Sequence, residues 1–143
     1  MCLRIDDNVK IAWKSGGWCY AWKVYFVSDT LYPIHNHRYS PVEVTGNNYV
    51  VSDRTSQEIN GSDDSPWIGL VYNGIHVFLD RKDAGAYNDS GRALVRVKCF
   101  KKDLVAIGTH SGSRHMKQAV FMKVKLSDNS VKEYKVKKIK RKR

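Results

Sequence analysis

The chain has few cysteines and prolines, and it has no long hydrophobic run. Its 143 residues include three cysteines without CxxC or similar spacing, which argues against a disulfide framework and a cysteine-rich zinc site. No apolar run approaches the roughly 20 residues of a membrane helix. The first residues also lack the basic and apolar regions of a secretory signal. We therefore expect a cytoplasmic protein with reduced thiols and no membrane partner.

Recognisable catalytic motifs are missing as well. There is no GxSxG elbow, no Walker-type glycine-rich loop, and no serine with His and Asp at a recognisable spacing. His35 and His37 lie in "HNH", but no pattern of Asp, Glu or Cys nominates a further ligand. We predict no metal and no cofactor, and the sequence favours binding over catalysis.

The hydrophobic pattern indicates a strand-rich domain. Residues 18–27 are apolar on both alternating faces, as in a central strand, and residues 92–100 carry Arg and Lys on one face only. We predict one α+β domain over residues 1–130, with about seven or eight short strands and one or two short helices. A mostly-β barrel or sandwich is the alternative. Residues 131–143 are expected to form a basic edge strand and C-terminal tail.

Local signals refine this picture. Residues 74–78 are expected to form a strand, followed by a short helix that Asp80 caps. Residues 127–130, "SDNS", are expected to be a turn that joins strands 118–126 and 131–139 into a hairpin. The polar stretch 53–66 is expected to be a long surface loop.

Several short segments carry a resemblance. "MCL", "CYAWKVY", "YSPVEV", "GNNY", "GIHVF", "VRVKCF" and "VAIGT" follow one another in this order. Together they resemble a group of small phage and prophage proteins. The resemblance implies a phage-encoded protein that works in the cytoplasm of the host cell, and it implies no particular activity.

The succession of a strand, a short helix and "LVRVKCFKKDLVAIG" is also similar to small ADP-ribosyltransferase-like domains. This resemblance implies a nicotinamide pocket formed by His76 and Phe78. The family's late catalytic Glu is not matched, because Asp128 is the only acid in residues 108–130. Without that carboxylate, the developing oxocarbenium charge loses its main support. A binding-only version of the domain remains an alternative.

The positive charge of the chain is concentrated at its C-terminal end. Residues 131–143 contain eight Lys or Arg and one Glu, whereas the preceding 130 residues contain 17 basic and 13 acidic residues. Such a segment gains affinity for any polyanion by counterion release, and it binds nucleic acid without base-sequence specificity. The predicted nucleic-acid contacts are Lys132, Lys135, Lys137, Lys138, Lys140, Arg141, Lys142 and Arg143. A solubilising tail is the alternative.

The stretch 108–117, "GTHSGSRHMK", combines small residues, hydroxyls and cations. A loop of this composition can hold a phosphate through backbone N–H groups and a guanidinium. The predicted anion-binding residues are His110, Ser111, Ser113, Arg114, His115 and Lys117. A polar hairpin connection is the alternative. His76, between two apolar neighbours, is interpreted as a hydrogen-bonded core histidine.

The leading functional hypothesis is therefore a small phage-type protein that binds nucleic acid or a nucleoprotein through its basic C-terminal region. A second hypothesis is a protein-directed inhibitor of a host enzyme or of an anti-phage defence complex. A third is an ADP-ribosyltransferase-like enzyme.

Overall fold

The fold is taken from a computed structural model of the chain. It describes residues 3–27, 34–37, 40–52, 59–60, 70–71, 74–87, 92–110, 112–134 and 137–138. At residues 27, 34–37, 40–41, 59–60, 70, 87, 114 and 137–138, it describes the backbone alone.

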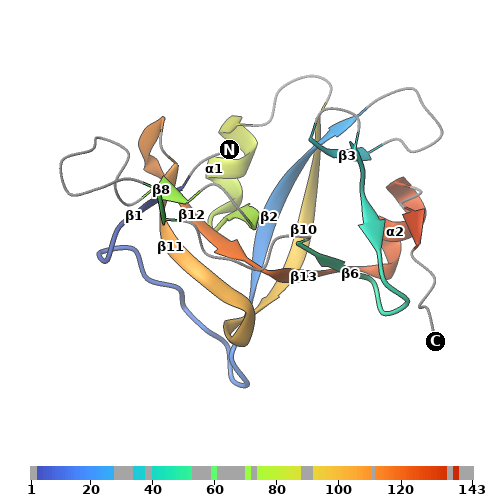
Figure 1. The fold of residues 1–143 in the computed structure, drawn as a ribbon, viewed down its shortest axis with the longest axis horizontal. Coiled ribbons are helices and arrows are strands. Elements are labelled where there is room, and N and C mark those ends of the chain that lie inside the picture. The colour runs from blue at the N-terminus through green and yellow to red at the C-terminus, as the bar shows by residue number, and fades with distance from the viewer. Residues whose placement is uncertain are drawn as a thin grey trace.

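The described strands form one large, mainly antiparallel sheet, and only β5 and β14 pair outside it (Figure 1). The order along the sheet is β6-β13-β10-β2-β9-β12-β11-β1-β8-β7, with β3 and β4 attached beside β2. The strands are β1 (Leu3–Ile5), β2 (Trp18–Val27), β3 (Ile34–His37), β4 (Ser40–Pro41), β5 (Glu43–Val44), β6 (Tyr49–Val51), β7 (Ile59–Asn60), β8 (Leu70–Val71), β9 (Ile75–Phe78), β10 (Arg92–Phe100), β11 (Leu104–His110), β12 (Ser113–Phe121), β13 (Lys123–Leu126) and β14 (Lys137–Lys138). The helices are α1 (Arg81–Tyr87), α2 (Asp128–Tyr134) and the short 3-10 helix η1 (Lys101–Asp103).

The central pair of the sheet is β2 and β10, which lie side by side over nine register positions from Arg92↔Phe26 to Phe100↔Trp18 (Figure 1). Side chains alternate between the two faces of a strand. One face of this pair carries Cys19, Ala21, Tyr25 and the odd-numbered residues of β10, and it is buried in the main core. Among the described strands, the order runs from β6 at one edge of the sheet to β7 at the other. These two strands do not pair with each other, so the sheet is not closed into a barrel.

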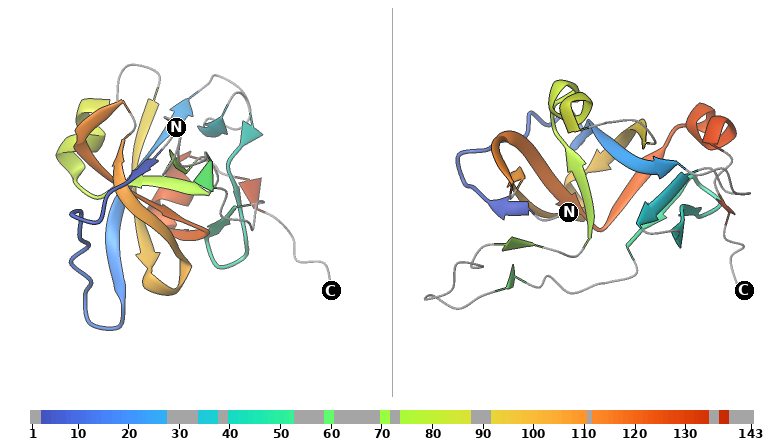
Figure 2. Two further views of the ribbon diagram at one scale, coloured as in Figure 1. Left: turned by 60° about the vertical axis from the view of Figure 1, so that its left-hand side comes forward. Right: turned by 90° about the horizontal axis from the view of Figure 1, so that it is seen from above.

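Helix α1 follows β9 as the sequence predicts. The side chain of Asp80 accepts a hydrogen bond from the backbone N–H of Lys82 at 2.8 Å, which caps the first turn. Ala84 of α1 packs against Val24 and Phe78 in a second core cluster. The helix therefore covers part of the sheet face that lies opposite the main core, beside β2, β9 and β12 (Figure 2).

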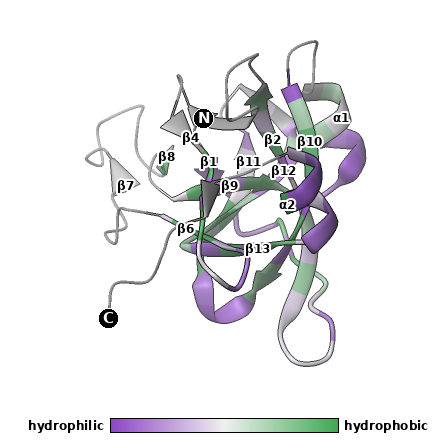
Figure 3. Ribbon diagram, turned by 90° about the vertical axis from the view of Figure 1, so that its right-hand side faces the viewer, coloured by the Kyte–Doolittle hydropathy of each residue, from purple (hydrophilic) through white to green (hydrophobic). Residues whose placement is uncertain are grey.

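The predicted hairpin between residues 118–126 and 131–139 is wrong. Residues 128–134 form helix α2, and β14 pairs in parallel with β5. The Ser127 hydroxyl accepts a hydrogen bond from the backbone N–H of Ser130 at 3.1 Å, so "SDNS" is a helix start and not a strand-to-strand turn. Val131 and Tyr134, three residues apart, both pack on the main core. Figure 3 shows α2 largely in the hydrophilic colour, as a surface helix requires.

Other expectations have mixed outcomes. The strand-rich architecture with two helices is confirmed in outline, and none of the described helices is long and apolar enough to cross a membrane. Within the expected surface loop 53–66, residues 59–60 form β7, and the rest of that stretch lies outside the described residues.

Candidate nucleic-acid interface

The register between β2 and β10 places aromatic and basic side chains on one sheet face. Trp18 lies opposite Phe100, Tyr20 opposite Lys98, and Trp22 opposite Arg96. All of these residues belong to the face that points away from the main core, because their neighbours Cys19 and Cys99 point into it. The two strands therefore alternate rings and cations across their common surface.

Two further strands extend this surface toward the sheet edge. Lys125 of β13 lies opposite Lys98, and Tyr49 of β6 lies opposite Lys125 in turn. Lys123 lies opposite Val51, which is 52% exposed. We call this surface the aromatic–basic face. It consists of Trp18, Tyr20, Tyr49, Arg96, Lys98, Phe100, Lys123 and Lys125.

The rings of the aromatic–basic face contact one another and the cations. Trp18 and Tyr20 meet edge to face with their centroids 5.1 Å apart, and the centroids of Tyr49 and Phe100 are 6.3 Å apart. The ammonium of Lys98 lies 4.3 Å from the ring centroid of Trp18 and 5.6 Å from that of Phe100. The Lys98 ammonium thus lies between a ring of β2 and a ring of β10.

The other cations of the face also lie over rings. The guanidinium of Arg96 is 4.2 Å from the Tyr20 centroid, and the ammonium of Lys123 is 4.6 Å from the Tyr49 centroid. Cation–π contact holds each charged group over its ring. Tyr20 remains 38% exposed and Arg96 is exposed, so both can meet a ligand.

The charge on this surface has one sign. Strands β2, β6, β10 and β13 contain no Asp or Glu, and five of their six cations lie on the side of the aromatic–basic face. The sixth, Lys23, lies on the other side of β2, where burial lowers its pKa to about 8. Lys98 and Lys125 face each other directly, a like-charge pair that destabilises a sheet unless an anion lies nearby.

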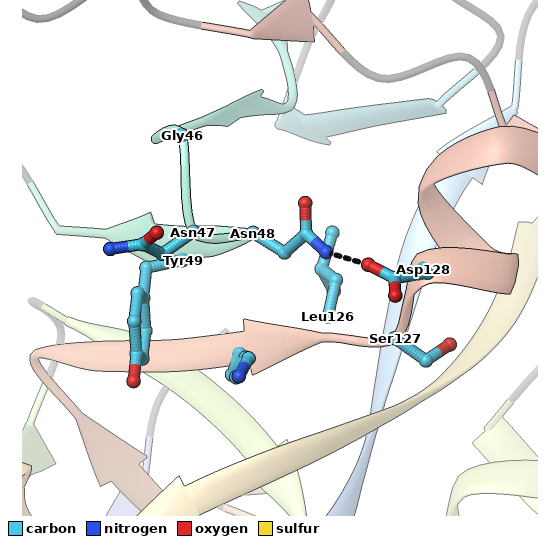
Figure 4. A pocket seen from close by; sticks show the side chains of 8 residues that line it. Gly46, Asn47, Asn48, Tyr49, Leu126, Ser127 and Asp128 are labelled. Carbon is cyan, nitrogen blue, oxygen red and sulfur yellow. Dashed lines mark hydrogen bonds between the residues drawn. The ribbon is translucent and has the colours of Figure 1, made fainter.

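A pocket adjoins the aromatic–basic face at the edge of the sheet (Figure 4). It lies where the turn before β6 approaches the end of β13 and the start of α2. Asn48, with a φ of 64°, ends this turn, and its backbone N–H donates to the carbonyl of Thr45 at 3.0 Å. Tyr49 and Lys125 belong both to the pocket wall and to the face.

The predicted C-terminal contacts fall only partly within the described residues. Lys132 is exposed on α2, and Lys137 and Lys138 form β14 with their backbone described alone. Lys135, Lys140, Arg141, Lys142 and Arg143 lie outside the described residues. Among the described residues of the expected edge strand, residues 131–134 are helical and Lys137–Lys138 form β14.

The predicted anion-binding loop is mostly strand. β11 continues to His110 and β12 starts at Ser113, so the connection is a short hairpin turn. The Nδ1 atom of His110 accepts a hydrogen bond from the backbone N–H of Gly112 at 3.0 Å, which occupies one donor that a phosphate would need.

The remaining residues of that loop are spread along the hairpin. The backbone N–H of Lys117 donates to Asp83 of α1 at 3.2 Å, and His115 is exposed. Ser111 and the side chain of Arg114 lie outside the description. An anion site at this turn stays a prediction.

His76 is a buried core residue, as interpreted from the sequence. It is 4% exposed, and its Nε2 and Nδ1 atoms lie 2.9 Å and 3.3 Å from the carbonyl oxygens of Val71 and Gly74. Burial lowers its pKa to about 4, and the charge of Lys23 adds to the effect. Phe78 is 0% exposed in the cluster under α1.

The ADP-ribosyltransferase-like and metal hypotheses gain no support from the described geometry. Asp128 lines the pocket at the sheet edge, whereas His76 and Phe78 are not among its lining residues. Within the described part of the chain, no group of three or more His, Cys, Asp or Glu could hold a metal ion. The side chains of His35 and His37 lie outside that part.

The aromatic–basic face was only partly accessible from the sequence. The alternation of apolar and basic residues in β10 identifies its solvent-facing side. The aromatic residues of β2, in contrast, are typical of a core strand. Of the rings that could stack bases, Tyr20 is exposed, Tyr25 is fully buried and Trp22 packs near α1. Trp67 lies outside the described residues.

Comparison with known proteins adds no relative. The chain matches no family model, no curated protein and no solved structure.

Proposed function

We propose that this protein binds single-stranded nucleic acid on its aromatic–basic face. The observation that carries the proposal is the Lys98–Lys125 pair, set among rings on four neighbouring strands without an acidic residue. A phosphate between these two ammonium groups would replace their repulsion with attraction. Nucleic acid is the polyanion that also supplies flat rings for Trp18, Tyr20 and Phe100.

The aromatic content favours single strands over a duplex. Side chains such as Tyr20 and Trp18 can stack only on bases that are not already stacked and paired. Base–aromatic stacking contributes about 1–3 kcal/mol per base and tolerates any sequence. Cations interleaved with the rings, such as Arg96, would follow the phosphates between successive bases.

The C-terminal cations add a second electrostatic contribution to the proposal. Residues 135–143 would strengthen binding by counterion release without contacting bases. The proposal thus keeps the nucleic-acid partner expected from the sequence and assigns its base contacts to the sheet. It also takes the domain to be an α+β protein of phage type that works in the host cytoplasm.

Fluorescence anisotropy with labelled oligonucleotides of about 12 nucleotides tests this proposal. Tyr20→Ala should weaken binding about tenfold by removing a stacking platform. The double variant Arg96→Ala/Lys98→Ala should weaken it further and reduce the slope of log Kd against log salt by about 1 to 2.

A charge-matched control lies on α1. Arg81 and Lys82 are both exposed there and are not among the residues of the aromatic–basic face, although α1 lies on the same side of the sheet beside Trp22. Replacing both with Ala removes the same charge as the double variant. Equal losses in the two double variants would reduce the effect to net charge and overturn the proposal. Wild-type protein that binds no oligonucleotide but captures a host protein would favour the protein-directed inhibitor instead.

A further inference from the structure

The exposed large hydrophobic side chains of the described residues all lie on one side of the sheet. They are Tyr20, Phe26 and Val51, which are 38%, 42% and 52% exposed. The residue before each of them on its strand, Cys19, Tyr25 or Val50, belongs to the main core, so the three side chains point to the opposite face. Tyr20 is part of the aromatic–basic face and Val51 borders it, whereas Phe26 lies at the other end of β2.

Phe26 repeats the arrangement of the aromatic–basic face at this other end of β2. It lies directly opposite Arg92, the first residue of β10, and the Arg92 guanidinium is 5.1 Å from the centroid of the Phe26 ring. Arg96 and Tyr20 make the same kind of contact at 4.2 Å. All four side chains point away from the main core, because they alternate with core residues along β2 and β10. A second ring with its own cation therefore shares the side of the sheet on which the aromatic–basic face lies.

Strands β2 and β10 connect the two ends. They run side by side along nearly their whole length (Figure 1), and neither contains Asp or Glu. Helix α1 lies beside β2, β9 and β12 and covers Val24 of β2. On β10, in contrast, Arg96 is exposed, and Leu94 and Arg92 are partly exposed. A ligand that reaches from Tyr20 to Phe26 therefore passes along the β10 side of the pair.

We propose that Phe26 and Arg92 form a second stacking site for the same single strand, an inference that rests on the proposed function. The strand lies along β2 and β10, with an unpaired base on the Phe26 ring and a phosphate near Arg92. Tyr20 and Phe26 are six residues apart on β2, which corresponds to about 20 Å. The ligand is thus a strand long enough to span both rings. A strand that crossed the sheet toward β6 would leave Phe26 without a role.

Fluorescence anisotropy with strands of two lengths tests the second site. A strand of about 12 nucleotides can reach both rings. A strand of about 3 nucleotides cannot, because even at twice the duplex spacing of about 3.4 Å per nucleotide its outer bases are about 14 Å apart. Phe26→Ala should therefore weaken binding of the longer strand about tenfold and change binding of the shorter one by less than about twofold. Tyr20→Ala should weaken binding of both.

Two further substitutions at Phe26 separate stacking from simple apolar contact. Phe26→Tyr keeps a flat ring and should bind the longer strand like the wild type. Phe26→Leu keeps an apolar side chain without a ring, so it should lose as much affinity as Phe26→Ala. Val51→Ala is the matched control, because it removes an exposed apolar side chain on β6, which β13 separates from β10. It should leave the affinity unchanged.

Each outcome bears on one of the two proposals. Wild-type affinity of Phe26→Ala or Phe26→Leu for the longer strand would overturn the second site and leave the aromatic–basic face intact. An equal loss for strands of both lengths, or an equal loss in Val51→Ala, would also overturn it, since neither depends on a strand that spans the two rings. Failure of the wild-type protein to bind any of these strands would overturn the proposed function, and the second site with it.

Discussion

Cys19 and Cys99 lie directly opposite each other on β2 and β10, and both side chains point into the main core. They are 6% and 0% exposed, and both are free thiols. The hydrogen bond that Cys99 makes with Cys19, together with burial, raises the pKa of the Cys99 thiol well above its usual range. The pair lies behind the aromatic–basic face, near the start of β2 and the end of β10.

Both thiols should be unreactive in the folded protein. The thiolate is the nucleophile in alkylation, and a buried Cys99 with a raised pKa is neither ionised nor accessible at neutral pH. The hydrogen bond with Cys99 lowers the pKa of the Cys19 thiol, so the protection of Cys19 comes from its burial alone. Iodoacetamide should therefore modify Cys19 and Cys99 only after denaturation. Peptide mass spectrometry on samples labelled with and without guanidinium chloride checks this expectation. Rapid labelling of either residue under native conditions would contradict the described burial.

Acid should destabilise the fold through His76. Burial lowers its pKa to about 4, whereas an unfolded histidine has a pKa of about 6.5. Between these values the unfolded state binds more protons, so the free energy of unfolding decreases as the pH falls from about 6.5 to about 4. The stabilisation that comes from keeping His76 neutral is fully present above pH 6.5. Its loss on acidification to below about pH 4 lowers the free energy of unfolding by about 3 kcal/mol.

Urea titrations at a series of pH values measure this effect. His76→Gln provides the comparison, because an amide can replace a ring N–H and does not titrate. The variant should show a flatter dependence of stability on pH than the wild type between about 4 and 6.5. Parallel curves for the two proteins would show that another group carries the acid sensitivity.

Two glycines should respond to alanine in opposite ways. A Cβ atom at Gly108 of β11 would overlap the backbone carbonyl of Arg4 in the neighbouring strand β1. Gly108→Ala should therefore lower the free energy of unfolding by about 2 kcal/mol or more. Gly85 of α1 has open space around it, so Gly85→Ala should raise stability by about 0.5–1 kcal/mol. Chemical denaturation of the two variants compares the signs, and a Gly108→Ala variant as stable as the wild type would contradict the β1–β11 packing.

The sequence predicts the central strands β2 and β10, but it does not predict which strands pair with them. Alternation in residues 92–100 fixes which side chains share a face of β10, and the cap at Asp80 marks the start of α1. Neither signal states that β10 pairs with β2 and β13. The aromatic–basic face depends on that pairing, because its eight residues come from four strands that are distant in sequence.

The prediction of a strand over residues 131–139, where α2 forms instead, fails for a local physical reason. "SDNS" supplies a hydroxyl that can cap a helix as well as turn a hairpin, and "VKEYKVKKI" alternates well enough to suggest a strand. The outcome is decided by packing, since Val131 and Tyr134 reach the core from one side of a helix. The pocket next to Asp128 exists only because this helix starts there, so sequence reasoning could not have located it.

Removing the C-terminal tail should separate the two contributions to binding. A variant that ends after Tyr134 keeps the aromatic–basic face and loses Lys135, Lys137, Lys138 and the cations that follow them. Its affinity for single strands should fall and depend less steeply on salt, because fewer counterions are released. Its preference for single strands over duplexes should persist, because the stacking rings remain.

Tyr20→Ala in the full chain should do the reverse. It should lower the preference for single strands while the slope of log Kd against log salt is unchanged. Competition binding with duplex and single-stranded oligonucleotides at two salt concentrations measures both quantities. A truncated protein that binds duplex and single strands equally would place recognition in the tail and not on the sheet.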